Sequence, residues 1–300
     1  MLKVAWNEHY AHPLPEGHRF PMEKYNLLPQ QLLHEGTLEK GNFFSPSEVS
    51  EKRVLKVHDQ DYFNRLKEKN LSRKEERATG FPLSDRLVHR ELIITQGTID
   101  AVNYAIEFGV SGNIAGGTHH AYRDRGEGFC LLNDIAVGSA YALDELGMKR
   151  ILVVDLDVHQ GNGTAKIFEK DQRVFTFSMH GAKNYPLHKE KSDLDIAMPD
   201  GTEDDEYLKK LKSILPELIE QTHPDLIFFQ SGVDVLKSDK LGRLALTIEG
   251  CKKRDQLVFE EAKKQGIPVV FNMGGGYSEK ISVIIEAHAN TYRTARDLYF

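Results

Sequence analysis

Two adjacent histidines and a short acidic segment contain the residue types that a metal-assisted hydrolase needs. The histidines are His119 and His120, and the segment is residues 155–159, Asp-Leu-Asp-Val-His. With Asp234, this segment offers two carboxylates and an imidazole, which can hold one Zn²⁺ and leave a coordination position open for water. The separate histidine pair is then available to move protons.

The residues around the acidic segment favour the same interpretation. Residues 151–154, Ile-Leu-Val-Val, are typical of a buried parallel strand that leads directly into the segment. Because side chains alternate along a strand, we expect Asp155, Asp157 and His159 to point to one face. Unpaired buried charge is unfavourable, so a cation among these side chains is the simplest compensation. Residues 161–163, Gly-Asn-Gly, predict a tight turn immediately afterwards.

Composition limits the class of protein. The chain has 300 residues, 40% of them hydrophobic, as is ordinary for a globular protein. Its net charge of −6 is not the excess of positive charge that is typical of proteins that bind nucleic acid. Cys130 and Cys251 lie far apart, which indicates a reducing compartment without a disulfide framework. The chain has no long apolar run and no apolar leader, so we expect a cytoplasmic protein that binds neither nucleic acid nor membrane.

Strands and helices are predicted to alternate after a region of short surface helices between residues 45 and 80. The predicted helices span 85–108 and 133–146 and begin near residues 203, 248 and 278. The predicted strands are 113–115, 151–156, 173–178, 226–230 and 268–272. Thr202 and Asp205 resemble a capping pair for the helix near residue 203. This alternation predicts an α/β fold: a single domain over residues 1–300 with a doubly wound, mostly parallel sheet and helices on both faces.

Polar or glycine-rich segments follow the carboxyl ends of several predicted strands. Open α/β sheets bind their ligands at this edge, so the segments are expected to meet in one site. They are His119-His120, Asp157 with His159, residues 178–180, Asp234 and residues 274–277.

Several blocks of sequence resemble the zinc-dependent histone deacetylase superfamily, in the family's order and over roughly residues 113 to 278. These blocks are residues 116–120, 128–134, 155–163, 230–234 and 274–277. Two further stretches, residues 201–207 and 253–259, are most similar to the class IV branch. The resemblance implies an arginase-like α/β fold and hydrolysis of an acyl-amide on lysine or a related amine.

The resemblance also implies roles for individual residues. Asp157, His159 and Asp234 would bind Zn²⁺, although this ligand set also accepts Fe²⁺. Tyr277 would donate its phenolic O–H to the developing oxyanion. A structural K⁺ or Na⁺ would be bound by Asp155, Asp157, His159 and Ser178, and the acyl-lysine tunnel would be lined by Gly128, Phe129, Tyr185, Leu241 and Gly275.

The resemblance makes His119 and His120 the proton-handling pair, oriented by Asp155 and Asn162 respectively. An imidazole beside a carboxylate tends to stay protonated, whereas one beside a neutral amide can titrate near pH 7. We therefore expect His120 to act as the general base and later as the acid. Some family members have Asp where this chain has Asn162, which makes the difference in pKa a hypothesis for this chain.

The sequence favours a zinc-dependent amidohydrolase that removes acetyl or longer acyl groups from lysine side chains of proteins or peptides. An alternative keeps the mechanism but takes acetylated polyamines or other small acylated amines as substrates. A binuclear manganese ureohydrolase would share the fold, but it would need more Asp ligands. A non-catalytic acyl-lysine binding module would have lost a ligand or Tyr277, and this chain has kept them all.

Overall fold

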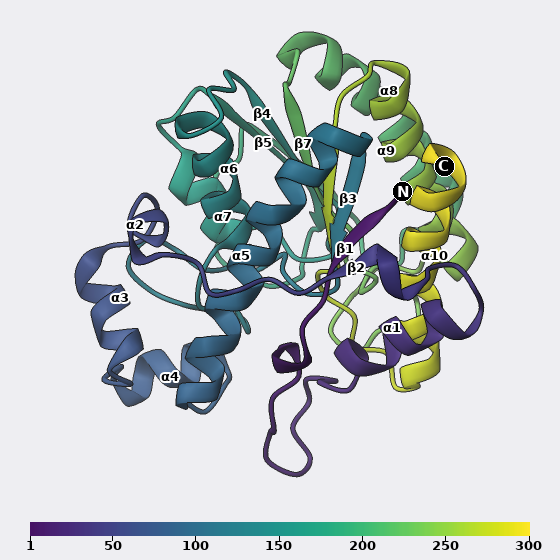
Figure 1. Cartoon of the computed structure of the whole chain (residues 1–300). Helices are drawn as coiled ribbons and strands as arrows, with labels where there is room; N and C mark the ends of the chain where they lie inside the picture. The colour runs from purple at the N-terminus through teal and green to yellow at the C-terminus, as the bar shows by residue number, and fades with distance from the viewer.

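Eight parallel strands form one sheet at the centre of the molecule (Figure 1). The computed structural model covers residues 1–300 and places the strands in the order β2-β1-β3-β8-β7-β4-β5-β6. Every pairing between neighbouring strands is parallel. The strands are β1 Lys3–Ala5, β2 Phe43–Phe44, β3 Val110–Asn113, β4 Ile151–Asp155, β5 Val174–Gly181, β6 Leu194–Met198, β7 Leu226–Gln230 and β8 Val269–Asn272. The predicted doubly wound parallel sheet is therefore confirmed.

Two groups of helices cover the two faces of the sheet (Figure 1). The first group is α5 Asp85–Phe108, α6 Asp134–Asp144 and α7 Asn162–Phe168, and the second is α1 Lys24–His34, α8 Asp204–Thr222, α9 Ile248–Lys264 and α10 Ile281–Tyr299. The short helices α2 Glu51–Val54, α3 Gln60–Lys67 and α4 Arg73–Thr79 occupy the region where short surface helices were predicted. None of the helices combines the length and apolar character needed to cross a membrane.

Local sequence explains where the helices nearest the site begin and end. The Asn133 side chain accepts a hydrogen bond from the Ala136 amide and caps the first turn of α6. Helix α5 ends at Gly109, whose φ of +86° is a conformation that favours glycine. The central strands β4, β7 and β8 are buried along their whole length, as expected for strands covered on both faces.

Several predicted boundaries were wrong. Strand β3 ends at Asn113, where the prediction began, because the pairing with β8 involves residues 110–113. Residues 161–163 do not form an isolated tight turn, since Gly161 is the N-cap of α7. Thr202 does not cap α8 either: its hydroxyl donates to the Pro199 carbonyl, and Glu203 is the N-cap residue. Strand β5 continues to Gly181, so residues 178–180 lie within the strand.

Strands β1, β2 and β6 and helices α1 and α7 were not predicted. Strands β1 and β2 contain three and two residues, too few for a periodic pattern. Strand β6 lies at the edge of the sheet and is only partly buried, so its sequence does not read as a buried strand. These three strands depend on pairing with residues distant in the sequence.

Gly112 in β3 is required for packing within the sheet. It pairs with Phe271 of β8, and a methyl group at its Cα would lie 2.5 Å from the Phe271 ring. We expect Gly112→Ala to lower the free energy of unfolding by about 1–3 kcal/mol, the usual effect of overpacking. Gly41→Ala is the control, because the added methyl group meets nothing within 4 Å. Urea unfolding of both variants tests this, and equal stability would contradict it.

Candidate active site

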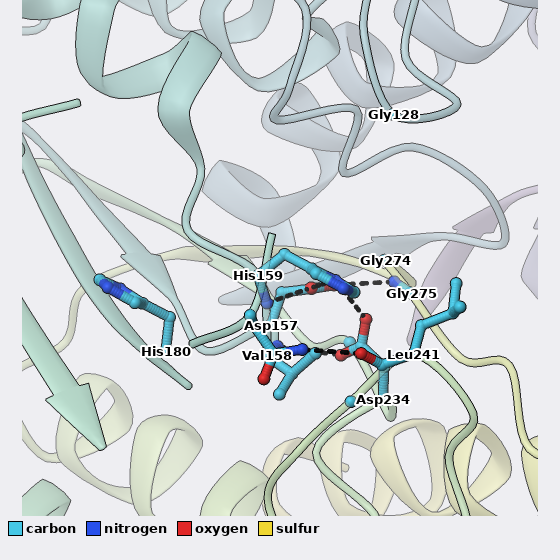
Figure 2. Close-up of polar contacts among 12 residues, drawn as sticks. Gly128, Asp157, Val158, His159, His180, Asp234, Leu241, Gly274 and Gly275 are labelled. Atoms are coloured by element: carbon cyan, nitrogen blue, oxygen red, sulfur yellow. Dashed lines mark hydrogen bonds and ion pairs between the residues drawn. The ribbon is translucent and has the colours of Figure 1, made fainter. Parts of the chain in front are cut away.

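Three buried side chains from neighbouring loops form a group that can hold one metal ion. Asp157 and His159 follow β4, and Asp234 follows β7; their ligand atoms all lie within 4.8 Å of one another. His159 Nδ1 is 3.1 Å from Asp157 Oδ1 and 3.1 Å from Asp234 Oδ2 (Figure 2). The structure therefore brings together the three residues assigned to the metal, and we call them the Asp-His-Asp triad.

Backbone amides fix the orientation of both carboxylates. The Val158 amide donates to Asp234 Oδ1 over 2.9 Å, and the Gly275 amide donates to Asp157 Oδ2 over 2.9 Å (Figure 2). Glycine is needed at position 275, because a Cβ there would lie 2.0 Å from Asp234 Oδ2. In the same way, a Cβ on Gly232 would lie 2.2 Å from Asp157 Oδ2. The carboxylates are thus held by the backbone before any ion binds.

The electrostatics of the triad fit a divalent cation. Burial and the neighbouring Asp157 carboxylate raise the pKa of Asp234 to about 7. Burial lowers the pKa of His159, but the two carboxylates outweigh it and raise that pKa to about 10. A pair of buried carboxylates calls for positive charge between them. Two carboxylates and one imidazole nitrogen are a donor set that Zn²⁺ accepts.

The two adjacent histidines have different partners. His119 Nδ1 lies 2.7 Å from Asp155 Oδ2, at the end of β4, and His120 Nδ1 lies 2.5 Å from Asn162 Oδ1, at the start of α7. Their ring centroids are 4.1 Å apart. The structure therefore pairs each histidine with the residue expected to orient it.

The two histidines have pKa values that shift in opposite directions. Burial lowers the pKa of His119, but the carboxylates of Asp155 and Asp157 outweigh burial and raise it to about 9. Burial and the neighbouring imidazoles of His119 and His159 hold the pKa of His120 well below its ordinary value. The pKa of His120 therefore lies below the value near 7 that the sequence analysis expected.

A cavity of about 420 Å³ reaches His159 of the triad, and most of the predicted tunnel residues line it. Its walls include Gly128, Phe129, Tyr185 and Leu241, with His120 and His159 also on its surface. Gly275 does not line it and lies instead at a smaller inner cavity of about 40 Å³ beside the triad. The cavity has the position expected of a tunnel that leads an extended substrate to the metal site.

Tyr277 lies on the wall of both cavities. Its ring centroid is 6.5 Å from that of His159 and 6.0 Å from that of Phe129. Burial, together with the charges of Asp234 and Asp157, raises the pKa of the Tyr277 phenol well above its ordinary value. The phenol therefore stays protonated and can act as a hydrogen-bond donor.

Two residues near Tyr277 escaped the sequence analysis. Lys24 of α1 is fully buried, and its Nζ donates to the Gly274 carbonyl over 3.1 Å. Burial lowers the Lys24 pKa to about 8. Asp239 accepts hydrogen bonds from the amides of Tyr277 and Leu241, at 2.6 and 2.8 Å, and so joins the tyrosine to the tunnel wall. The partners of both residues are backbone groups, which leave no motif in the sequence.

Ser178, the residue expected in a monovalent-cation site, lies opposite Asp155 in the pairing of β4 with β5. Its hydroxyl is 2.9 Å from His180 Nδ1. His180 itself points away from the triad (Figure 2). The structure thus places Ser178 beside Asp155 and leaves His180 outside the triad.

Comparison with known proteins identifies the family of this chain. A family model described as the histone deacetylase domain matches residues 18–292. The chain belongs to the histone deacetylase family. This confirms the resemblance found in the sequence, and the family and the fold together indicate a hydrolase of the deacetylase type.

Three proteins are similar to this member of the histone deacetylase family over most of its length. It is 42% identical over 297 residues to an uncharacterized protein of Picosynechococcus sp., with 99% of each chain covered. It is 33% identical over 277 residues to histone deacetylase 2 of Arabidopsis thaliana, covering 89% of this chain and 72% of that protein. A crystal structure of a histone deacetylase homologue complexed with SAHA has a TM-score of 0.85 at 25% identity, covering 99% of this chain and 84% of that one.

The triad predicts one metal ion per chain, with Asp234 as a direct ligand. We expect Asp234→Asn to weaken Zn²⁺ binding by more than the roughly 10–100-fold typical of outer partners of metal ligands, since it removes a ligand charge. Asp195→Asn is the control, because Asp195 accepts from Gln160 Nε2 and lies outside the triad. Competition with a chelator measures both affinities. Equal binding by the two variants would contradict the assignment.

Proposed function

We propose that the protein is a zinc-dependent lysine deacylase that removes acetyl or longer acyl groups from lysine side chains of proteins or peptides. The observation that supports this most directly is the buried Asp-His-Asp triad at a cavity of about 420 Å³, with His120 and Tyr277 also at its surface. A bound Zn²⁺ would polarise the amide carbonyl and make water a nucleophile at neutral pH. The similarity of residues 253–259 to the class IV branch supports placing the protein there.

His120 is suited to accept the proton of the attacking water. The Asn162 amide NH₂ donates to Tyr122 Oη over 2.9 Å, which leaves Asn162 Oδ1 facing His120 Nδ1. Because Oδ1 only accepts, Nδ1 of His120 carries a proton and donates it, and Nε2 is free to act as a base. His119, held protonated by Asp155, supplies positive charge beside it.

Tyr277 is suited to stabilise the oxyanion that forms when the carbonyl is attacked. The phenol stays protonated, and its backbone is fixed by the hydrogen bond from the Tyr277 amide to Asp239 Oδ2. Such a preorganised donor favours the transition state over the ground state, because it is aimed at charge that appears only there. His120 and Tyr277 thus supply the proton transfer and the oxyanion donor that amide hydrolysis needs.

The charges at the cavity mouth favour acyl-lysine within a protein over an acylated polyamine. Arg19 and Arg77 line the mouth, are exposed, and form no ion pair with a carboxylate. The acidic residue of the same cavity, Glu127, accepts from Tyr185 Oη and Arg125 Nε, each over 2.8 Å. The mouth therefore presents uncompensated positive charge, which repels the protonated amines of a polyamine.

The monovalent cation and the cytoplasmic location remain part of this proposal. Support for a K⁺ or Na⁺ near Asp155 comes from the position of Ser178 on the neighbouring strand. Oxygen ligands from backbone and side chains suit such hard cations.

The deacylase proposal predicts turnover of acyl-lysine peptides by the zinc-loaded protein. A panel with acetyl, butyryl, octanoyl and myristoyl groups would also measure the preferred chain length, with N-acetylated polyamine beside it. We expect Tyr277→Phe to lower kcat by about 10²–10³-fold, the usual loss on removing an oxyanion donor. Tyr141→Phe, which removes a hydroxyl that donates to Asn103 at the surface and lies outside the cavity, should leave kcat nearly unchanged. Turnover of the polyamine alone would contradict a protein substrate.

The role of Asn162 predicts a change in pH dependence. Asn162→Asp would place a carboxylate beside His120 Nδ1 and raise the pKa of that imidazole. A general base must be neutral, so activity is lost as pH falls below its pKa. The acidic limb of kcat/KM is therefore expected to move to higher pH in the variant. An unchanged pH profile would exclude His120 as the base.

A further inference from the structure

A fully buried arginine on α9 lies against the two loops that hold the triad. Arg254 has no exposed surface, and it belongs to the segment 253–259 that the sequence singled out only for its similarity to class IV. Its Nη1 donates to the carbonyls of Leu156 and Gly232, at 3.1 and 2.5 Å. Its Nη2 donates to the Ser231 carbonyl over 3.1 Å. Three backbone carbonyls thus converge on one guanidinium.

These carbonyls come from two separate loops, and each loop carries a carboxylate of the triad. Leu156 immediately precedes Asp157 in the loop after β4. Ser231 and Gly232 precede Asp234 in the loop after β7. Because β4 and β7 are neighbours in the sheet, one side chain can reach the backbone of both loops.

The guanidinium is itself held rigidly. Its Nε and Nη2 lie 2.8 and 2.7 Å from Asp255 Oδ1, and Asp255 Oδ2 accepts from Thr291 Oγ1 of α10 over 2.6 Å. One hydrogen bond to Asp255, three to carbonyls and the ion-pair contact from Nη2 to Asp255 involve all three nitrogens of the guanidinium. Neither the pair nor its partners can rotate without leaving a buried polar group unsatisfied, which is unfavourable.

We propose that Arg254 is a positioning residue for the metal centre, and that it sets the separation of Asp157 and Asp234 by joining the backbones of their loops. This inference rests on the proposed metal-dependent function. Carbonyl oxygens that converge in a dry interior repel one another unless a donor lies between them. A planar guanidinium can bind several oxygens at fixed angles, whereas an ammonium cannot.

The test is Arg254→Lys, which keeps the charge but offers fewer donors in a different geometry. We expect chelator competition to show Zn²⁺ and Co²⁺ affinities lowered by about 10–100-fold, as for other partners that orient metal ligands. The absorption spectrum of the Co²⁺-loaded variant should differ from that of the wild type, because the ligands are displaced. On an acyl-lysine peptide, kcat should fall while KM stays unchanged, since the mouth of the cavity is untouched.

A matched control separates positioning from stability. Val258→Ala removes buried methyl groups from the same helix and affects no hydrogen bond to either loop. It should lower the free energy of unfolding but leave the metal affinity unchanged. If Arg254→Lys does not fold, Thr291→Val removes only the hydroxyl that holds Asp255 and should weaken metal binding to a smaller degree.

Two results would overturn the proposal. One is a folded Arg254→Lys protein, or a folded Thr291→Val protein in its place, with wild-type metal affinity and Co²⁺ spectrum. The other is an equal loss of affinity in Val258→Ala. The affinity measurement does not depend on the substrate, so a wild-type protein that binds metal but hydrolyses no acyl-lysine peptide contradicts only the proposed function.

Discussion

Asp157 and Asp234 bury two carboxylates side by side, and much of the architecture around the site follows from accommodating them. Asp157 and Asp234 are fully buried, and taking such charges out of water is strongly unfavourable unless partners surround them. Backbone amides therefore point at their outer oxygens, and glycines at positions 232 and 275 let the backbone come close enough. The glycine-rich sequence around the triad is a consequence of this packing.

The all-parallel sheet is what allows distant segments to supply these partners. Because every strand runs in the same direction, the loops after β3, β4, β7 and β8 emerge at one edge. The histidine pair, the triad and Tyr277 belong to these loops, although more than 150 residues separate His119 from Tyr277 in the sequence. The helices on both faces keep water from the sheet and hold the loops in register.

Local patterns made much of this architecture predictable. Helix α5, strand β7 and the start of α9 follow from apolar periodicity and capping residues, and the structure has them where predicted. The grouping of the triad followed from its residue types at strand ends. The predicted range of β3 began too late in the sequence, because Ile114 and Ala115 are buried and apolar although they follow the last residue that pairs with β8. Lys24 and Arg254 could not be found, since backbone carbonyls of remote residues bind them.

The distribution of partners among the buried acids supports a divalent metal ion at the triad. Asp155 has His119, Asp255 has Arg254, and Asp239 accepts three backbone amides. Asp157 and Asp234 form no ion pair with a lysine or arginine, and the imidazole between them is shared by both. Even protonated, with its pKa raised to about 10, the single imidazole of His159 offsets only one of the two buried negative charges, whereas a divalent cation bound by all three side chains can offset both. The acids Asp155, Asp255 and Asp239 each have partners within the chain, so the triad is where a divalent charge is needed.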